Sequence, residues 1–326
     1  MRAATLTVSA CGIALAACLT ACGKGSAASA GSTSPPPAAQ FMVAAMAPLP
    51  GGGFLWGDRV TGEIRRVDAA GRPTGGVVAR VAVATANLHG LLGLARAPGG
   101  RVFAAWTDTA DRLTVGQVSP GPTRVIWRAP AFSRFDVGGH LAVTPQGWLL
   151  LGVGAGVLHA PTGAPARPTG GLLLLRPDRG PGQAPAVLST GWNNPFAFAY
   201  TPGGRLWVAD NVPGTRGERL ARGDLDGRPT HVTPLPPGTA PSGLAAVADN
   251  RLVVCGFQSH LLQAFRITSG QRAVAVGAPI ARNCWIGVIR LADGRLAYAG
   301  PGATVTVISP TGTGAHAVRL TAGARA

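Results

Sequence analysis

The fold of this chain is indicated by the stretch Thr201-Pro202-Gly203-Gly204-Arg205-Leu206-Trp207-Val208-Ala209-Asp210. An apolar run at 196–200 enters it, a Pro-Gly-Gly turn reverses the chain, and a second apolar run leaves it. Turn residues between two short apolar runs are typical of a β-hairpin. The stretch therefore predicts a pair of antiparallel strands.

Five more segments share this outline, at 49–56, 97–103, 144–150, 248–253 and 292–297. The first apolar residues after the six turns stand at 54, 102, 149, 206, 252 and 296, with spacings of 48, 47, 57, 46 and 44 residues. A hairpin that recurs every 40–50 residues or so, about one per blade, is typical of β-propellers. The sequence thus predicts an all-β fold, a six-bladed β-propeller with four-stranded antiparallel blades.

Each blade is expected to begin with an inner strand beside a central channel, over residues 41–47, 91–96, 141–144, 195–200, 243–247 and 286–291. Small residues dominate these runs, which suits six strands that crowd around one axis. The second strands carry aromatic residues such as Trp56 and Trp207, which we expect to pack between blades. Trp106 and Trp285 are also candidates for aromatic residues that contact a ligand.

The charge of the chain is strongly positive, +16 over 326 residues, and Lys24 is its single lysine. One interpretation is codon bias in a GC-rich genome, because Ala, Gly and Pro are abundant as well. The other is a basic surface that favours anionic lipid headgroups or acidic wall polymers. The sequence lacks a basic block interleaved with aromatic residues, so we expect no nucleic-acid partner. We also expect a monomer.

The N-terminal segment predicts export. Residues 3–21 are apolar and uncharged, follow Arg2 and end in small residues, as a signal peptide does. Leu19-Thr20-Ala21-Cys22 resembles the bacterial lipobox, in which the cysteine is lipidated. Leu15-Ala16-Ala17-Cys18 fits the same pattern, but a polar linker follows Cys22 directly; an uncleaved transmembrane anchor is the other alternative. Residues 22–40 then form a Gly/Ser/Pro-rich linker, and 41–320 form the propeller. We therefore expect a protein anchored by a lipid at Cys22 to the outer face of the bacterial cytoplasmic membrane.

The propeller itself keeps two of the five cysteines, Cys255 in the fifth repeat and Cys284 before the sixth. An oxidising compartment allows a disulfide between them. Two buried thiols are the alternative. A disulfide would link neighbouring blades.

Polar residues gather at predictable places in the repeat. Residues just before each inner strand and just after each second strand should lie on one face, around the mouth of the channel. They are Asp58, Arg59, His89, Asp108, Asp111, Asp136, His140, Asn193, Asn194, Asp210, Asn211, Ser242, Gln258, His260, Arg282 and Asn283. Convergent polar groups at such a mouth predict the binding site.

Several motifs, in order, resemble the glucose/sorbosone dehydrogenases. They are Gly90-Leu91-Leu92-Gly93-Leu94-Ala95, the segment 135–149 around Gly138-Gly139, Asn194-Pro195 with the strand pair beyond, and Pro241-Ser242-Gly243-Leu244. The similarity covers residues 42 to 310. It implies a six-bladed propeller that oxidises sugars with pyrroloquinoline quinone (PQQ) and calcium.

The departures from this family concern the groups that do the chemistry. Asp136 stands where the family has its histidine base, and His140 follows four residues later. An ordinary carboxylate is a weaker base than histidine unless burial raises its pKa. Asn193 replaces the arginine before Asn194, which leaves these two residues as the candidate contacts to the cofactor.

The family's positions for binding the cofactor with cations and for binding calcium are also mostly lost in this sequence. The family's fifth-blade lysine falls near Gln258, and Arg282 is the arginine nearest to its sixth-blade pair. Of the family's calcium segment, Glu218 remains, and Asp210 is a second candidate metal ligand. The ligands of PQQ and calcium are thus mostly not retained.

Three functions follow from this pattern. The first is a non-catalytic or altered-site binding protein for a carbohydrate, a cell-wall polymer or an exported partner, because fold alone does not transmit function. The second is a PQQ-dependent aldose dehydrogenase with Asp136 as its base. The third is a metal-dependent lactonase-type hydrolase, with Asp136, Asn194 and Asp210 as ligands.

Overall fold

The computed structural model of the chain describes residues 43–130, 137–155, 170–212 and 217–320. The predicted signal peptide, Cys22, the linker 22–40 and the candidate base Asp136 lie outside the described residues. Within the described ranges, no helix is long and apolar enough to cross a membrane.

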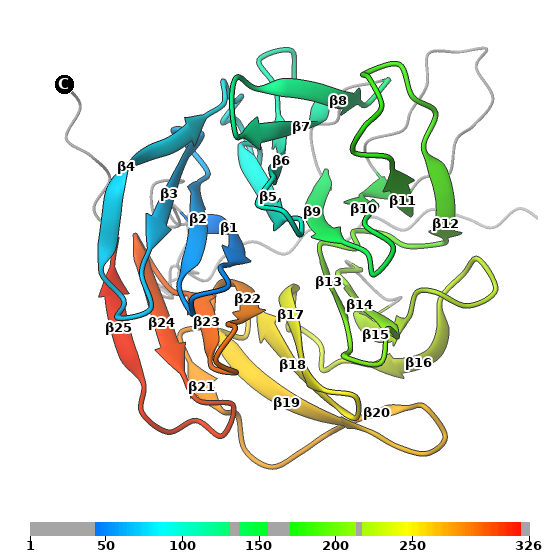
Figure 1. The fold of residues 1–326 in the computed structure, drawn as a ribbon. Coiled ribbons are helices and arrows are strands. Elements are labelled where there is room, and N and C mark those ends of the chain that lie inside the picture. Colours follow the sequence, from blue (N-terminus) through cyan, green and yellow to red (C-terminus); the bar gives the residue numbers. More distant parts are fainter. Residues whose placement is uncertain (1–42, 131–136, 156–169, 213–216, 321–326) are drawn as a thin grey trace, which may run out of the picture. The chain divides into compact units, whose positions relative to one another are not determined.

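Six antiparallel sheets, each contiguous in sequence, surround a common axis, which confirms the predicted six-bladed β-propeller (Figure 1). The first three blades are β1 (Val43–Pro48), β2 (Phe54–Asp58), β3 (Glu63–Val67) and β4 (Pro73–Arg80); β5 (Leu91–Arg96), β6 (Val102–Thr107), β7 (Leu113–Ser119) and β8 (Arg124–Arg128); and β9 (Gly138–Val143), β10 (Leu149–Val153), β11 (Gly171–Leu175) and β12 (Ala186–Thr190).

The remaining three blades follow the same order from the axis outward. They are β13 (Ala197–Tyr200), β14 (Leu206–Asp210), β15 (Arg219–Arg222) and β16 (Thr230–Pro234); β17 (Pro241–Ala248), β18 (Arg251–Gly256), β19 (Leu261–Ile267) and β20 (Ala273–Ala275); and β22 (Ile286–Arg290), β23 (Leu296–Ala299), β24 (Thr304–Ile308) and β25 (His316–Arg319). The short β21 (Ala281–Arg282) pairs with β19. The predicted inner strands correspond to β1, β5, β9, β13, β17 and β22.

The turn between the first and second strands repeats because its sequence repeats. In the fourth blade, Thr201 N donates to Arg205 O at 2.9 Å and Gly204 N donates to Thr201 O at 2.8 Å. Gly204 has φ +79°, a conformation that glycine adopts without steric cost. The turns at 49–53, 97–101, 144–148 and 291–295 have the same pair of backbone bonds. The fifth blade has a tighter turn, in which Ala248 pairs directly with Arg251.

Small residues let the inner strands approach one another around the axis. A Cβ atom on Gly93 of β5 would lie 2.1 Å from the carbonyl oxygen of Gly139 on β9. A Cβ atom on Gly243 of β17 would lie 2.5 Å from the backbone of Gly287 on β22. Any larger side chain at either position would push two blades apart.

The apolar core is divided into six clusters, one between each pair of neighbouring blades. Trp56 packs between blades six and one, Trp106 between one and two, and Trp207 between four and five. All three are buried, as expected for aromatic residues that fill space between blades. Trp106 is therefore a core residue and not a ligand-binding one.

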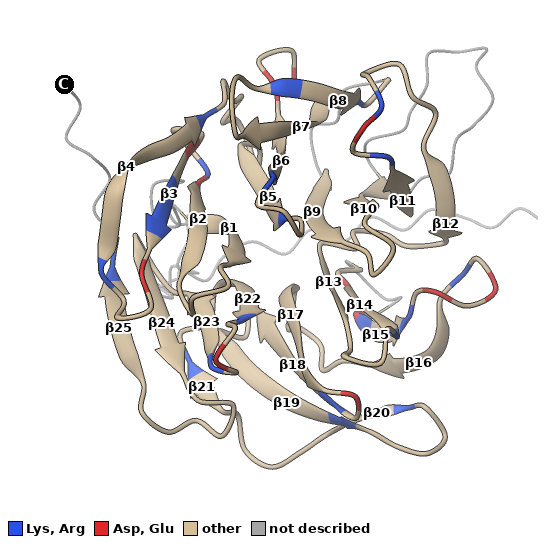
Figure 2. Cartoon of the chain, in the orientation of Figure 1, with Lys and Arg blue, Asp and Glu red and all other residues tan. Residues whose placement is uncertain are grey.

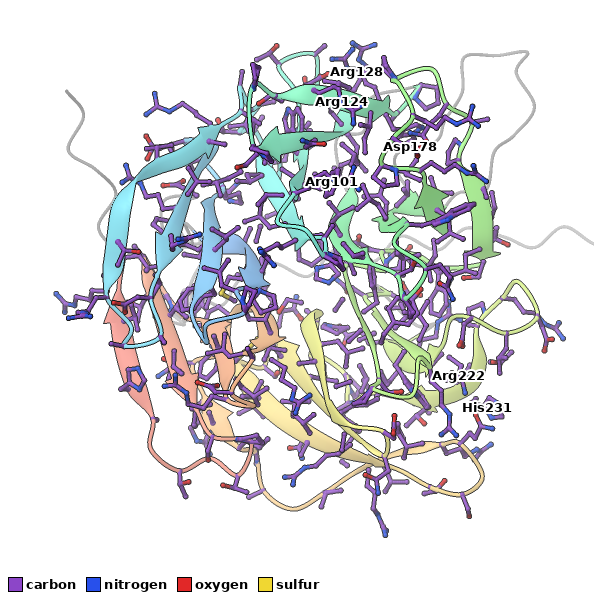
Figure 3. The ribbon with its side chains drawn as sticks, in the orientation of Figure 1. Arg101, Arg124, Arg128, Asp178, Arg222 and His231 are labelled. Atoms are coloured by element: carbon purple, nitrogen blue, oxygen red, sulfur yellow. A yellow bond between two sulfur atoms is a disulfide. The ribbon has the colours of Figure 1, made fainter. Side chains whose placement is uncertain are left out.

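Charged residues lie mainly on the outer strands and turns (Figure 2). The inner strands β1, β9, β13 and β17 contain no Lys, Arg, Asp or Glu. Arginines join neighbouring blades at their outer parts, among them Arg124 and Arg222, which are labelled in Figure 3. Arg222 donates to Gln271 Oε1 at 2.5 Å, and Arg124 donates to Pro177 O at 2.8 Å. The outer edges of the blades are thus held by polar contacts and their centres by apolar packing.

A disulfide joins Cys255, near the end of β18, to Cys284, just before β22, with their Cα atoms 5.6 Å apart. Both residues are fully buried between the fifth and sixth blades. The sequence left two alternatives for Cys255 and Cys284, a disulfide or two buried thiols. The structure contains the disulfide, which links neighbouring blades.

Candidate functional site

A pocket of about 100 Å³ lies on the propeller axis, at the end where the inner strands begin. Every blade contributes to its wall a residue at or beside the start of its inner strand: Ala44, Leu92, Gly138, Phe196, Ser242 and Ile286. The adjoining segments add Arg59, Leu88, His89, Val137, Asn194, Asn211, Ala240, Pro241 and Phe257. We call this the mouth pocket. Five of its members belong to the predicted polar set: Arg59, His89, Asn194, Asn211 and Ser242.

Arg59 is the cation of the described wall. It follows β2 and is only 1% exposed. Asp58 holds the turn before it, because its Oδ1 accepts hydrogen bonds from Val60 N at 2.8 Å and Thr61 N at 3.0 Å. The guanidinium donates from Nη1 to His89 O at 2.5 Å. Burial lowers the pKa of Arg59, and the charge of Asp58 opposes that effect.

His89 lies beside Arg59 and is 2% exposed. Its Nδ1 is 3.2 Å from Oδ1 of Asp111, which lies in the turn between β6 and β7. Its Nε2 is buried and has no hydrogen-bond partner. A carboxylate that accepts from Nδ1 favours the tautomer in which Nε2 carries a lone pair. His89 thus lines the mouth pocket while its Nε2 stays buried and unpaired.

Asp210 organises the segment that presents Asn194. It is fully buried at the end of β14. Its carboxylate accepts from Asn193 N and Asn194 N, both through Oδ1, at 3.0 and 2.8 Å. Its Oδ2 also accepts hydrogen bonds from Nε and Nη2 of Arg219, at 3.1 and 2.8 Å. Burial raises the pKa of Asp210, and these four donors act against that rise.

The two asparagines before β13 therefore have different roles. The Asn193 side chain donates to Asn211 O at 2.7 Å and closes the local turn. Asn194 lines the mouth pocket, and its Oδ1 is buried without a hydrogen-bond partner. Of these two asparagines, Asn194 is the one that lines the mouth pocket.

Glu218 is buried behind the pocket wall and is not part of it. Its Oε1 accepts from the backbone N of Ala240 at 2.7 Å, which positions a residue of the wall. Its Oε2 is buried without a partner. The two candidate metal ligands, Asp210 and Glu218, thus both hold backbone segments.

His140 lies on β9 and packs against aromatic residues instead of lining the mouth pocket. Its ring is 4.5 Å from that of Phe198, edge to face, and 6.2 Å from that of Phe196. Burial lowers the pKa of His140 to about 4, although a hydrogen bond with the backbone of Phe198 acts in the opposite direction. The residue is therefore neutral near pH 7 and a poor proton acceptor.

Gln258 and Arg282 are exposed, and neither belongs to the described wall of the pocket. Aromatic side chains stand near this side instead. The ring of Phe257, a wall residue, lies 6.2 Å from the ring of Trp285, edge to face. His260 stacks on Trp285 at 4.7 Å with an interplanar angle of 6°. Ser242 Oγ joins this group to the pocket by donating to Trp285 O at 2.8 Å.

The described residues do not fit PQQ and calcium. PQQ has three carboxylates and needs several fixed cations, whereas Arg59 is the one cation in the described wall. The carboxylate of Asp210 is occupied by Arg219 and two backbone donors. No group of three or more His, Cys, Asp or Glu side chains within the described part of the chain is placed to hold a metal ion.

No family model matches the sequence, and no curated protein matches it. The structure is similar to the PQQ-bound aldose sugar dehydrogenase of Streptomyces coelicolor, with TM-score 0.60, 23% identity, and coverage of 84% of this chain and 89% of that one. The chain has a sugar-dehydrogenase-like propeller fold. A putative glucose dehydrogenase of Thermus thermophilus gives TM-score 0.63, 23% identity and coverage of 84% and 92%. The gluconolactonase of Xanthomonas campestris gives a TM-score of 0.55 and 16% identity, with coverage of 79% of this chain and 83% of that one.

Two features of the site have no specific signal in the sequence. His89 and Asp111 both belong to the predicted polar set, but 22 residues separate them and nothing in the sequence pairs them. Phe257 directly follows an apolar strand and is indistinguishable there from a core residue. The repeat in the sequence identifies the face on which such residues lie, but not which of them meet.

Proposed function

We propose that this chain is an exported, lipid-anchored binding protein whose mouth pocket binds a carbohydrate. The observation that carries the proposal is the combination of buried polar groups without partners and aromatic rings at one place. Sugars present hydroxyl groups along their edges and apolar C–H faces, so they need both kinds of contact. The dehydrogenase-like scaffold supplies the pocket, while the groups expected for PQQ are absent from its described wall.

The polar side of the contact rests on Asn194, Ser242 and Arg59. The buried Oδ1 of Asn194 lacks a donor, which a ligand hydroxyl would supply. Arg59 would donate to a ring oxygen, hydroxyl or carboxylate of the ligand. Each of these residues lines the pocket from a different blade.

The aromatic side rests on Phe257 and Trp285. Trp285 is only half-buried, although most tryptophans of the propeller are buried in its core. His260 covers one face of the indole ring and keeps the ring in place. A sugar ring that enters the pocket would pack against this group.

Ligand-observed NMR tests the proposal with a panel of neutral sugars and uronic acids. We expect saturation transfer to at least one class of sugar, lost in Asn194→Ala and weakened in Trp285→Ala. Trp148→Ala is the matched control, because Trp148 is also half-buried but lies in the β9–β10 turn, at the opposite ends of the inner strands. Binding that survives Asn194→Ala and Trp285→Ala would assign it to another surface.

Titration with PQQ and calcium distinguishes this proposal from a quinone-dependent dehydrogenase. The absorbance of PQQ should show no stoichiometric binding. Thermal shifts with calcium, zinc and magnesium test the metal-dependent lactonase in the same way. Saturable stabilisation by one of these ions would contradict a site built without a metal.

The lipid anchor is a separate part of the proposal and rests on the sequence around Cys22. The disulfide between Cys255 and Cys284 supports export, because such bonds persist in oxidising compartments. Metabolic labelling with palmitate should mark the wild type and not Cys22→Ser. Labelling that persists in Cys22→Ser and disappears in Cys18→Ser would move the attachment to the earlier cysteine. An unlabelled wild type would contradict the anchor.

A further inference from the structure

We propose that the end of the propeller opposite the mouth pocket docks onto a membrane that contains anionic phospholipids. This end, which we call the turn face, consists of the turns between first and second strands and between third and fourth strands, with the strand residues beside them. Its segments are 48–54, 67–73, 96–102, 119–124, 143–149, 175–186, 200–206, 222–230, 248–251, 267–273, 290–296 and 308–316. The inference goes beyond the proposed carbohydrate binding and does not depend on it.

The positive charge of the described residues is concentrated on the turn face. Its segments contain 13 arginines and six aspartates, a net charge of +7 with histidine neutral. The described residues at the mouth end of the same strands contain seven arginines and six acidic residues, a net charge of +1. Propeller symmetry alone does not produce this difference. The turn face is therefore the surface on which an anionic partner is favoured.

Six guanidinium groups of the turn face are available to such a partner. None of them has a hydrogen-bond, ion-pair or aromatic partner among the described residues. Five of the six side chains are exposed, and the first is half-buried. They belong to Arg96, Arg179, Arg205, Arg228, Arg272 and Arg290.

The aspartates of the turn face do not cancel this charge. Three of them are already bound by neighbouring arginines of the same face, as in the pairs Arg72–Asp68 at 3.0 Å and Arg222–Asp224 at 2.9 Å. The mouth end differs, because its arginines pair within the protein: Arg219 binds the buried Asp210 at 2.8 Å. The positive charge that remains without a partner is thus on the turn face.

The unpaired arginines are spread around the ring and do not line a single groove. They come from the second to the sixth blades, and Figure 2 shows basic residues at the ends of strands in several blades. A groove would suit one extended acidic polymer, whereas charges distributed over a whole face suit a planar anionic surface. The distribution therefore favours a membrane over a polymer chain as the partner.

An aromatic side chain of the turn face fits the same partner. Trp148, in the β9–β10 turn, is half-buried, and the guanidinium of Arg176 lies 4.8 Å from the centre of its ring. Tryptophan and arginine both place an apolar body beside a polar group, and both are favoured at the level of lipid headgroups.

Docking by this face would direct the mouth pocket away from the membrane. β1 begins at the mouth end, so the chain between Cys22 and β1 must be able to pass the ring. About 20 extended residues reach at most about 70 Å. The longest strands, of eight residues, span about 27 Å, and the strands of a blade extend about 15 Å outward. The predicted anchor at Cys22 therefore permits this orientation, which leaves the pocket open to carbohydrates outside the membrane.

Co-sedimentation with lipid vesicles tests the proposal. The full chain carries Cys22→Ser, so that no lipid at this residue contributes. We expect binding to vesicles that contain phosphatidylglycerol to exceed binding to pure phosphatidylcholine vesicles by at least about tenfold. The binding should fall when the salt concentration rises from about 0.1 M to about 1 M, because salt screens exposed charges.

A matched pair of double variants tests the face itself. Arg205→Gln with Arg272→Gln removes two exposed, unpaired cations of the turn face. Each cation near an anionic membrane contributes about fivefold, so the partition coefficient should fall about 25-fold. Arg282→Gln with Arg319→Gln removes the same charge from exposed arginines at the mouth end and should change the coefficient by less than about threefold. The N-terminal segment is the same in both variants and cancels in their comparison.

Three results would overturn the inference. The first is equal binding to neutral and anionic vesicles, and the second is an equal loss in the two double variants. The third is binding to soluble polygalacturonate, lost in Arg205→Gln with Arg272→Gln, by a protein that does not bind the anionic vesicles; it would assign the face to an acidic polymer. Sugar binding measured by NMR should be the same in both double variants, so a failure of the carbohydrate proposal leaves this test unaffected.

Discussion

Buried polar groups in this propeller are of two kinds. The carboxylate of Asp210 has four donors and no remaining capacity that a ligand could use. In contrast, Nε2 of His89 and Oδ1 of Asn194 are buried without partners at the mouth pocket. An unpaired buried polar atom destabilises the folded state, so such atoms usually mark a place where a ligand or water binds. Asp210 is therefore structural, whereas His89 and Asn194 both line the pocket, and we propose Asn194 as a ligand contact.

Asp210→Asn should lower the free energy of unfolding by about 2–4 kcal/mol, because it leaves the Arg219 guanidinium without its charge partner. The loss is less than for a fully buried pair, since the side chain of Arg219 is 26% exposed. Urea unfolding monitored by tryptophan fluorescence measures it. Asp293→Asn is the control: its pair with Arg295 is exposed and is worth less than about 1 kcal/mol. Equal losses in both variants would contradict the structural role.

His140 should make the protein less stable in weak acid. The pKa of His140 is lowered to about 4, while an unfolded histidine has its ordinary value of 6.5. The stability is complete above pH 6.5 and falls as the pH drops toward 4, because only the unfolded chain binds the proton; the loss at pH 4.5 is about 2–3 kcal/mol. Urea unfolding at pH 7.5 and 4.5 measures the difference in the free energy of unfolding. His140→Gln should reduce this difference by about 2–3 kcal/mol. His316→Gln, the control, should leave it unchanged.

At the scale of the element, a blade is specified by its own segment of chain. The Pro-Gly-Gly turns repeat in sequence and form the same backbone hydrogen bonds in the structure. The fifth blade departs from this turn, and it is also the blade that carries one half of the disulfide. The cross-link connects two neighbouring blades whose strands share no backbone pairing.

Removal of this cross-link should destabilise the protein. The disulfide closes a loop with a sequence separation of 29 residues. A loop of that length predicts a loss of about 3–4 kcal/mol in a Cys255→Ala, Cys284→Ala double variant. Thermal unfolding measures the change, and reduction of the wild type should reproduce it. Alkylation of Cys255 and Cys284 in unreduced, denatured protein would show that the bond does not form.

At the scale of the molecule, the described strands close the ring without exchange between the first and sixth blades. The first blade is built entirely from residues 43–80 and the sixth from 286–319, so no strand of one completes the sheet of the other. Closure depends on the apolar cluster between them, which includes Phe54, Trp56, Val305 and Val318. Arg295 adds a hydrogen bond across the seam to Ala69 O at 3.1 Å.

Phe54→Ala should therefore weaken the whole ring and not one blade alone. A buried phenylalanine replaced by alanine typically costs about 3–5 kcal/mol, and the unfolding transition should remain single. Hydrogen exchange should show lower protection in all six blades. Val187→Ala, at a residue that is 50% exposed on β12, should change the stability by less than about 0.5 kcal/mol. A separate early transition of the first and sixth blades would contradict closure by this seam.

The sequence predicts the fold well because the information is local and repeated. Six turns of similar composition at similar spacing locate six hairpins, and the predicted inner strands at 91–96 and 286–291 match β5 and β22 within a residue. The candidate site is predicted in part. Asn194 lies in the pocket as expected, whereas Gln258 and Arg282 do not reach its described wall. His140 packs in an aromatic environment that no pattern along the chain reveals.

What the sequence alone determines is therefore the number of blades, the strand order within each blade and the end of the propeller at which polar residues gather. These properties follow from turn chemistry and from alternation within about 50 residues of chain, the length of one repeat. The tertiary structure decides which polar groups satisfy one another and which remain unpaired. Arg219 binds Asp210, and Asp111 binds one nitrogen of His89 while the other stays buried and unpaired. Such pairings depend on distances of a few ångströms between different turns and strands, and those distances exist only once the ring has closed.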